Sequence, residues 1–520
     1  MLRFSSILAL TLAGAAAHAT GFGVPETAIL SYHVFRRAWD ARKKNAIALV
    51  YTIDAELAVD TANGIASPDV SYKFVAQTNA RPKKRPVVIG AGPCGLLAGL
   101  ILAEMGFCPL ILERGKVVRE RTKDTWGLWR RGVLNAASNV QFGEGGAGTF
   151  SDGKLYSQIK DPRHLGRKVL TEFVEAGAPE EILYIAKPHI GTFRLVTMVE
   201  SIRAKIEALG GEYRFSAHVT DFDIRDGQMH GLTLADGEYI ETNHVVLAVG
   251  HSARDTFEIL HERGVFMEQK PFSIGFRIEH PQGMIDRHRF GPNAGNPILG
   301  AADYKLVHHA KNGRSVYSFC MCPGGTVVAA TSEPGRVVTN GMSQYSRAER
   351  NANAGIVVGI NPEDYPGGVL AGVEFQRRWE SAAYVAGGGN YQAPGQLVGD
   401  FIAGKTSSNF GEVQPSYKPG VHLTDLAPTL PDYAIAAIRE ALPAFGKTIP
   451  GFDRADAVLT GVETRTSSPL RITRGRELCS LNTRGLYPAG EGAGYAGGIL
   501  SAGVDGIKVA EAVGLSLAGA

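Results

Sequence analysis

Cysteine is scarce in this sequence. The chain of 520 residues has five cysteines, at positions 94, 108, 320, 322 and 479, and this odd, scattered set is unlike a disulfide framework. Such usage favours a reducing compartment, so we expect a cytoplasmic protein. Ile7 to Ala17 is apolar, however, and Ala17-His18-Ala19 has the shape of a signal-peptidase site. Export, with residues 1–19 as a signal peptide, therefore stays open as the alternative.

Strong charge of one sign and long hydrophobic runs are also missing. The 54 basic and 51 acidic residues give a net charge of +3, which offers no reason to expect a nucleic-acid or membrane partner. No segment reaches the ~18 uninterrupted apolar residues of a membrane span. The basic run Arg81-Pro82-Lys83-Lys84-Arg85 lies between prolines and is typical of a solvated linker. We expect a small-molecule substrate and neither a membrane nor a nucleic-acid partner.

Glycine, in contrast, is abundant. The chain has 64 glycines, well above the usual share of about 7%. Many of them gather at 90–95, 143–153 and 485–506, where backbone must approach a ligand closely or turn with positive φ. The length exceeds that of one hydrophobic core, roughly 250–300 residues, so several domains are expected. The predicted divisions are a small amino-terminal α+β module (1–80), a nucleotide-binding domain in two parts (81–268 and 451–520) and a substrate or cap domain (269–450).

The first glycine cluster follows a buried strand. Val87-Val88-Ile89 leads into Gly90-Ala91-Gly92-Pro93-Cys94-Gly95 and then a helix. These glycines permit the tight turn, the close approach of a pyrophosphate and the packing of helix on strand. The helix N-terminus favours the anion, and Pro93 suits its first turn. The next strand, 109–112, ends at Glu113, which is expected on the adenosine ribose hydroxyls, so the nucleotide is FAD or NAD rather than NADP.

Two later segments favour FAD over NAD. The apolar strand 245–249, ending at Gly250, follows hairpin turns at Asp226-Gly227 and Asp236-Gly237. The segment 485–503 resembles the closing motif of glutathione-reductase-like flavoproteins, in which an acidic residue holds a ribityl hydroxyl and a helix N-terminus faces the flavin. Glu491 stands where aspartate is usual in that motif. Backbone N–H groups of residues 498–500 would stabilise negative charge on the reduced flavin.

The segment 141–154 is too rich in glycine to be a plain helix or strand. We expect it to line the pyrophosphate and the flavin, with Lys154 near the ring or the substrate, and a surface loop is the alternative. The predicted cofactor-binding residues are Gly90, Gly92, Pro93, Gly95, Glu113, Arg114, Gly145, Gly146, Ala147, Gly148, Lys154, Val249, Gly250, Gly490, Glu491, Gly498, Ile499 and Leu500.

No catalytic acid or base stands out. His251 and Lys154 are weak catalytic candidates. For His251, a role in packing alone is an equally good interpretation. No metal site is expected, because His308-His309 lacks further ligands at metal spacing. Cys320 and Cys322 are expected to be structural, since they have CxC rather than CxxC spacing in a strand-like setting. The candidates for clamping an anionic substrate are Arg277, Arg465, Arg471 and Arg474.

Several long runs, taken with the two nucleotide signatures, resemble the FAD-dependent dehydrogenases that are sometimes called NAD(FAD)-utilising dehydrogenases. The resemblance implies an α/β fold: an FAD-binding Rossmann-like domain with a short β-meander, an inserted α+β substrate or cap domain and a small amino-terminal α+β module. It implies FAD as cofactor and no agreed substrate. The runs that carry the resemblance are 40–44, 138–146, 187–192, 318–325, 340–343 and 463–469.

Two functions are compatible with these observations. The first is an oxidoreductase that moves a hydride between flavin N5 and an unidentified organic substrate held by residues 269–450. The sequence has no second unit of strand, GxGxxG turn and helix, which a permanent NAD(P)H site would need. NAD(P)H would therefore bind only transiently. The alternative is a flavoprotein that acts as a binding or RNA-associated module, with residues 1–80 contacting the partner and a largely structural FAD.

Overall fold

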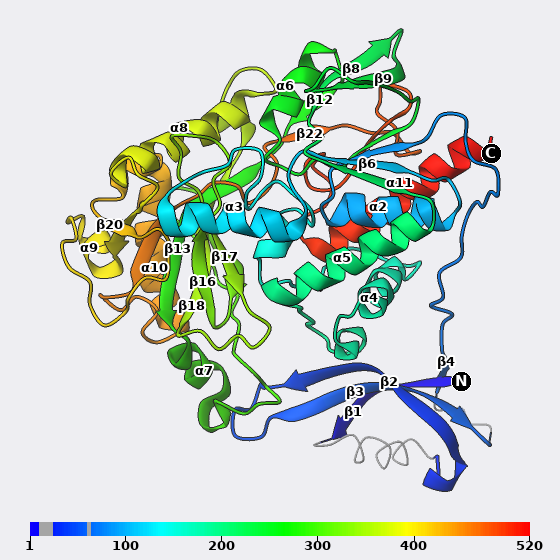
Figure 1. Cartoon of the computed structure of the whole chain (residues 1–520). Coiled ribbons are helices and arrows are strands. Elements are labelled where there is room, and N and C mark those ends of the chain that lie inside the picture. Colours follow the sequence, from blue (N-terminus) through cyan, green and yellow to red (C-terminus); the bar gives the residue numbers. More distant parts are fainter. Residues whose placement is uncertain (10–23, 60–63, 520) are drawn as a thin grey trace.

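The structure is a computed structural model that describes residues 1–9, 24–59 and 64–519 (Figure 1). The Ala17-His18-Ala19 site of the export alternative lies outside these residues. Among the described helices, none is both long and apolar enough to cross a membrane. The mixed α/β fold confirms the predicted class.

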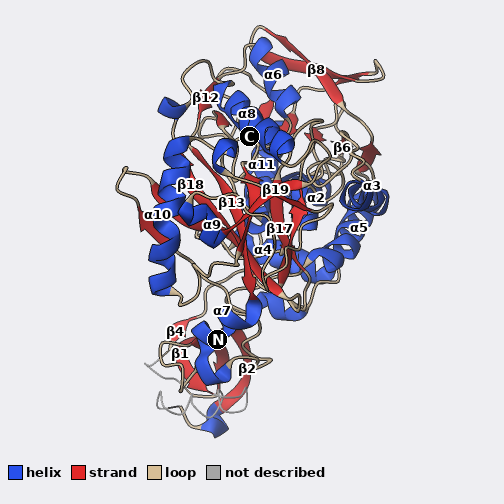
Figure 2. Ribbon diagram, turned by 90° about the vertical axis from the view of Figure 1, so that its left-hand side faces the viewer, coloured by secondary structure: helices blue, strands red, loops and turns tan. Residues whose placement is uncertain are grey.

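The amino-terminal module is a sheet of four strands in the order β2-β3-β1-β4. The strand expected to begin near Ala46 is β3, and a long preceding strand, β2, pairs with it. Figures 1 and 2 both show this sheet set apart below the rest of the molecule. Its elements are β1 (Leu2–Ala9), the short 3-10 helix η2 (Glu26–Ala28), β2 (Ile29–Asp40), β3 (Ala48–Leu57) and β4 (Ile65–Ala66).

A parallel sheet of five strands forms the centre of the nucleotide-binding part. Its order is β23-β11-β5-β6-β7. The first four of these strands are buried and largely apolar, as expected where both faces of a parallel sheet are covered, whereas the edge strand β7 is polar and half-buried. Its strands are β5 (Val87–Ile89), β6 (Leu110–Glu113), β7 (Glu212–Phe215), β11 (Val245–Leu247) and β23 (Leu486–Pro488). The helices of this part are α2 (Pro93–Glu104), α3 (Val118–Arg131), α4 (Leu165–Glu175), α5 (Thr192–Ala208), α6 (Arg254–Glu262) and α11 (Ile499–Ala518).

The predicted meander is present. Strands β8 (Val219–Arg225), β9 (Gln228–Leu234) and β10 (Tyr239–Glu241) form an antiparallel sheet. Asp226 and Gly227 connect the first pair with φ of 49° and 68°, the left-handed region that such tight hairpins require. The chain then returns to the parallel sheet as β11. This order places the Gly250 end of β11 beside the end of β5, where the nucleotide turn begins.

The cap is built on a seven-stranded sheet in the order β14-β15-β18-β13-β21-β19-β20, with its own hydrophobic core. Because β21 belongs to this sheet, residues 458–463 group with the cap rather than with the closing part of the nucleotide-binding domain. The strands are β13 (Phe272–Pro281), β14 (Val307–His309), β15 (Ser315–Cys322), β18 (Asn351–Ile360), β19 (Ala393–Leu397), β20 (Val421–Leu423) and β21 (Val458–Glu463).

Smaller elements complete the body. Two further pairs of strands, β12 (Met267–Gln269) with β22 (Leu470–Ile472) and β16 (Gly325–Ala329) with β17 (Thr339–Ser343), flank the domain junction. The cap helices are α7 (Gln282–Phe290), α8 (Ala371–Ala386), α9 (Val398–Ala403) and α10 (Asp432–Thr448). The short 3-10 helices are η3 (Ala147–Phe150), η4 (Glu180–Leu183), η5 (Gly291–Asn293), η6 (Pro362–Asp364) and η7 (Ala427–Thr429).

Candidate functional site

A cavity of about 410 Å³ lies between the nucleotide-binding part and the cap. Its walls come from the ends of β5, β6 and β11, from the start of α11 and from the cap strand β15. This is the position at which open α/β sheets bind ligands, outside the carboxyl ends of the strands. Of the predicted cofactor residues, those that line the cavity are Gly90, Gly92, Pro93, Glu113, Arg114, Gly146, Ala147, Gly148, Lys154, Val249, Gly250, Gly490, Glu491, Gly498, Ile499 and Leu500.

The turn from β5 to α2 has the backbone that a bound pyrophosphate needs. Gly90 has φ of +100°, and a Cβ on Gly95 would lie 1.8 Å from the Gly90 carbonyl oxygen. Gly95 therefore packs behind the cavity wall. The helix α2 has no side-chain cap at Gly92, so the N–H groups of its first turn keep their capacity to bind an anion.

Glu113 connects three segments around this turn. Its carboxylate accepts hydrogen bonds from the backbone N–H groups of Ala91 at 2.8 Å, Gly115 at 2.9 Å and Gly143 at 2.9 Å. The residue is buried at the end of β6 and faces the cavity. Its place is that of the ribose-binding carboxylate, and it also holds the glycine-rich segment beside the turn.

The glycine-rich segment is held by Arg121, a buried residue of α3 that the sequence did not single out. Its guanidinium donates hydrogen bonds of 2.7 Å to the carbonyl oxygens of Asn139, Val140 and Glu144. Burial lowers the pKa of Arg121 to about 10. A Cβ on Gly146 would lie 2.7 Å from Gly92 Cα, so this segment contacts the nucleotide turn directly. This contact explains how the glycine-rich segment can line the cavity, as predicted. Gly145, in contrast, packs against Thr149 behind the cavity wall.

The start of α11 forms the opposite wall. Gly498 has φ of +98°, and no side chain caps the helix, which leaves its first N–H groups able to stabilise a negative charge. Asp505 accepts a 2.7 Å hydrogen bond from the Gly490 N–H and pairs with Arg474. A Cβ on Gly506 would lie 2.2 Å from the Cys94 carbonyl oxygen, so α11 and α2 pack backbone against backbone. The two helix N-termini therefore border one cavity.

Glu491 lines this wall, and the pKa of its carboxyl group is shifted. Burial raises the pKa of Glu491 to about 8, and Lys270 opposes the shift. The side chain is therefore mostly protonated at neutral pH and can donate a hydrogen bond, which a carboxylate cannot do. The predicted role on the ribityl chain is compatible with a donating group.

Charged groups collect beside the glycine-rich segment. Lys154 Nζ lies 3.3 Å from an Asp152 carboxylate oxygen and donates a hydrogen bond to the Met321 carbonyl. Arg347 pairs with the same carboxylate, with Nε at 2.9 Å from it. Burial would raise the pKa of Asp152, but Lys154 and Arg347 hold it below its usual range. Lys154 thus supplies a fixed positive charge at the cavity wall.

His251 also lies in the cavity, at the end of β11. Burial, together with Arg465 and Arg254, lowers the pKa of His251 to about 3, so the ring is neutral at physiological pH. One ring nitrogen lies 2.9 Å from the Ser252 hydroxyl oxygen. The structure brings both weak catalytic candidates, His251 and Lys154, to the cavity, and their catalytic role stays a prediction.

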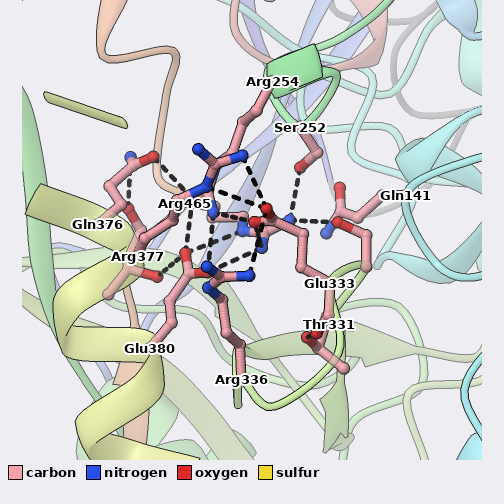
Figure 3. A network of polar contacts seen from close by, with 12 residues as sticks. Gln141, Ser252, Arg254, Thr331, Glu333, Arg336, Gln376, Arg377, Glu380 and Arg465 are labelled. Atoms are coloured by element: carbon pink, nitrogen blue, oxygen red, sulfur yellow. Dashed lines mark hydrogen bonds and ion pairs between the residues drawn. The ribbon is translucent and has the colours of Figure 1, made fainter. Parts of the chain in front are cut away.

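A buried ionic network joins the nucleotide-binding part to the cap (Figure 3). Glu380 of α8 accepts hydrogen bonds from Arg254 at 2.7 and 3.0 Å and from Arg465 at 2.8 and 3.0 Å. Figure 3 shows Glu333 approaching the same two arginines from the other side. Arg465 also donates to Ser252, the neighbour of His251. The network fixes the β11 to α6 connection against the cap.

The four arginines considered as an anionic-substrate clamp have contacts within the protein or lie at its surface. Arg277 pairs with Glu463 at 2.8 Å through two nitrogens, Arg465 is bound by Glu380, and Arg474 is bound by Asp505. Arg471 is exposed and stacks over Tyr495 at 5.4 Å. Three of the four guanidinium groups thus have protein acceptors. Of the four arginines, Arg465 lines the cavity and the other three do not. Within the part of the chain that the structure describes, no group of three or more metal-ligating side chains is found.

The basic run after the amino-terminal module is bound to the body. Lys84 lies 2.7 Å from Glu241, and Arg85 lies 2.5 Å from Glu212. In the module, the Phe35 ring lies between the guanidinium groups of Arg3 and Arg167. These basic side chains therefore have intramolecular partners.

Comparison with solved structures and with protein sequences gives several matches. Among solved structures, CtdE in complex with FAD is 12% identical, with 83% of this chain and 84% of that chain covered and a TM-score of 0.32. The open conformation of a flavocytochrome c3 fumarate reductase is 12% identical, with coverage of 84% and 79% and a TM-score of 0.36. An uncharacterised protein of Clostridium beijerinckii is 48% identical over 488 residues, 92% of this chain and 91% of that protein. Residues 271–466 match the family described as "FAD-dependent protein, C-terminal domain-like".

Proposed function

The chain belongs to one family with the clostridial relative, and its residues 271–466 match the model of an FAD-dependent protein. From this premise we propose that it transfers a hydride between FAD and a small organic substrate held under the cap. FAD is its cofactor, and the protein is a flavoprotein oxidoreductase in the general sense. The proposed hydride transfer is supported chiefly by one observation: the N-termini of α2 and α11 border the same cavity.

The residues of the cavity have separate tasks in this proposal. The α2 N-terminus and Gly92 bind the pyrophosphate, and Glu113 binds the adenosine ribose. Glu491 binds the ribityl chain, and the α11 N-terminus stabilises negative charge at the ring. Bound FAD supplies a two-electron carrier. The positive charge of Lys154 favours an anionic group on the reactants, and the cap excludes water from the reacting atoms.

The test is anaerobic mixing of the FAD-loaded protein with NADH or NADPH, followed by the visible flavin absorbance. We expect slow, poorly saturable bleaching with either nucleotide, because the chain has no second dinucleotide turn to hold a donor. Rapid bleaching that saturates tightly with one nucleotide would contradict a transient donor. If neither nicotinamides nor a broad panel of organic metabolites changed the flavin spectrum, the oxidoreductase proposal would fail and a largely structural FAD would be favoured.

A further inference from the structure

The connection between β11 and α6 contains His251 and Ser252, at the side of the nucleotide-binding part that faces the cap. Gly250, just before them, has φ of +75°, a left-handed conformation that glycine adopts without steric cost. Both His251 and Ser252 line the cavity. His251 is half-buried and Ser252 is buried. The connection therefore places an imidazole ring and a neighbouring hydroxyl at the cavity wall.

Arg465 determines part of the hydrogen bonding of Ser252. Its Nη1 donates to the Ser252 hydroxyl oxygen at 3.0 Å and to the Ser332 hydroxyl oxygen at 2.7 Å. Its Nε and Nη2 donate to Glu380 at 3.0 and 2.8 Å, which fixes the plane of the guanidinium group. A guanidinium group has donors and no acceptor, so Ser252 accepts from Arg465. The hydroxyl hydrogen of Ser252 is therefore left for another acceptor.

His251 Nδ1 is the acceptor that remains. It lies 2.9 Å from Ser252 Oγ, and among the described residues this oxygen has no further partner except Arg465. If Nδ1 carried the ring proton, Ser252 would accept from both neighbours, and its own hydrogen would have no protein acceptor. Buried donors without an acceptor are costly. Ser252 therefore donates to Nδ1, and the proton of the neutral ring is on Nε2.

The ring keeps this one donor for the cavity. Burial, followed by the charges of Arg465 and Arg254, lowers the pKa of His251 to about 3, so a single nitrogen is protonated. Nε2 has no hydrogen-bond partner among the described residues, while the ring lines the cavity. An N–H donor held in a fixed direction beside a guanidinium group suits an oxygen atom that carries or develops negative charge.

We propose that His251 binds an oxygen atom in the cavity as a hydrogen-bond donor through Nε2–H, and that Ser252 and Arg465 are positioning residues that hold its ring in this tautomer. The oxygen belongs to FAD or to a carbonyl or carboxylate group of the organic reactant. Because Arg465 follows the cap strand β21, the placement of the cap determines the orientation of the donor. The inference rests on the proposed function, since it adds a residue to the same cavity.

NMR of the FAD-loaded protein, isotope-labelled at the histidine ring nitrogens, tests the tautomer without any reaction. The resonances of His251 are those that His251→Gln removes. We expect Nε2 to be protonated and Nδ1 to be an unprotonated acceptor. Ser252→Ala should shift the Nδ1 resonance, whereas Ser252→Thr, which keeps the hydroxyl, should leave it nearly unchanged. A protonated Nδ1, or an Nδ1 resonance that Ser252→Ala does not move, would overturn the inference.

Replacement of the ring tests the donor. The side-chain amide of glutamine can reach the position of Nε2, whereas the shorter asparagine amide resembles Nδ1. His251→Leu and His251→Asn should each lose about 10-fold in one of two measurements, and His251→Gln less than ~3-fold, because one hydrogen bond contributes roughly a factor of ten. A loss of FAD affinity places the oxygen on FAD. Unchanged FAD affinity with slower anaerobic bleaching by NADH, whose nicotinamide carboxamide has such an oxygen, places it on the reactant.

His261→Leu, at an exposed position of α6, is the control and should change neither quantity. If all three variants of His251 matched the wild type in both measurements, the donor role would be overturned. A loss in His251→Gln as large as that in His251→Leu would overturn it as well. Absence of NADH bleaching in the wild type would count against a nicotinamide donor in the proposed function, since the NMR resonances and the FAD titration do not depend on that reaction.

Discussion

Glu113 is the residue on which the nucleotide turn and the glycine-rich segment both depend. Glu113→Ala removes the acceptor of three buried N–H groups, so we expect a loss of at least ~1–3 kcal/mol in the free energy of unfolding. FAD affinity should fall roughly ten- to a hundredfold, because the proposed charge-assisted hydrogen bond to the ribose would be lost as well. Urea unfolding and a flavin titration measure the two effects. Glu120→Ala, at an exposed position of α3, is the control and should change neither quantity.

Glu491 gives a pH dependence of defined sign. Its pKa in the folded protein is about 8, above the ordinary 4.5, so the stability that its protonated form contributes is complete below pH 4.5 and is lost as the pH rises through 8. Glu491→Gln imitates the protonated form. Without added flavin, the variant should match the wild type near pH 4.5 and have a higher urea midpoint at pH 8 and above. Equal urea midpoints at pH 8 and above would show that Glu491 ionises normally.

At the scale of elements, helix α2 depends on one glycine for its approach to β5. A Cβ on Gly95 would lie 1.8 Å from a backbone oxygen, and backbone there cannot give way without opening the nucleotide turn. We expect Gly95→Ala to weaken FAD binding by ~100-fold or more, seen as flavin lost during purification and in titration. Gly99→Ala places the same group in the same helix, 3.1 Å from the Ile111 side chain rather than against backbone, and should have a much smaller effect.

At the scale of the whole molecule, Glu380 connects the cap to the nucleotide-binding part. Glu380→Gln removes the buried carboxylate that pairs with both Arg254 and Arg465 and leaves Glu333 as the carboxylate that they share, which should cost up to about 3–5 kcal/mol. Glu374→Gln on the same helix breaks an exposed pair with Arg377 and should cost ~0–1 kcal/mol. Thermal or urea unfolding compares the two variants.

The same carboxylate predicts acid sensitivity. Burial would raise the pKa of Glu380, but Arg254 and Arg465 hold it well below its ordinary value of 4.5. Its contribution to stability is therefore complete above pH 4.5 and declines only as the pH falls through the lowered folded-state pKa. The stability difference between wild type and Glu380→Gln should stay constant from pH 8 to about 5 and shrink at lower pH. A difference that grew on acidification would contradict this ionic role.

The nucleotide turn, the carboxylate at Glu113, the meander turns and the helix start at Gly498 could all be predicted from the sequence. These features depend on local backbone conformation. Glycines, hairpin residues and a short apolar strand specify that conformation within a few neighbouring positions. Sixteen of the predicted cofactor residues line one cavity for this reason, and the other two, Gly95 and Gly145, pack behind its wall.

Which charged groups are paired, and which face the cavity, depends on how distant parts of the chain pack together. Arg465 and Glu380 are 85 positions apart, and Arg277 and Glu463 are 186 apart. Their pairing converts arginines that could have clamped a substrate into structural ones. The hydrogen bond from Arg465 to Ser252 depends on the placement of the cap, and the hold of Arg121 on the glycine-rich segment depends on burial. Burial and long-range pairing arise when distant segments pack together, so they cannot be predicted from a local sequence pattern.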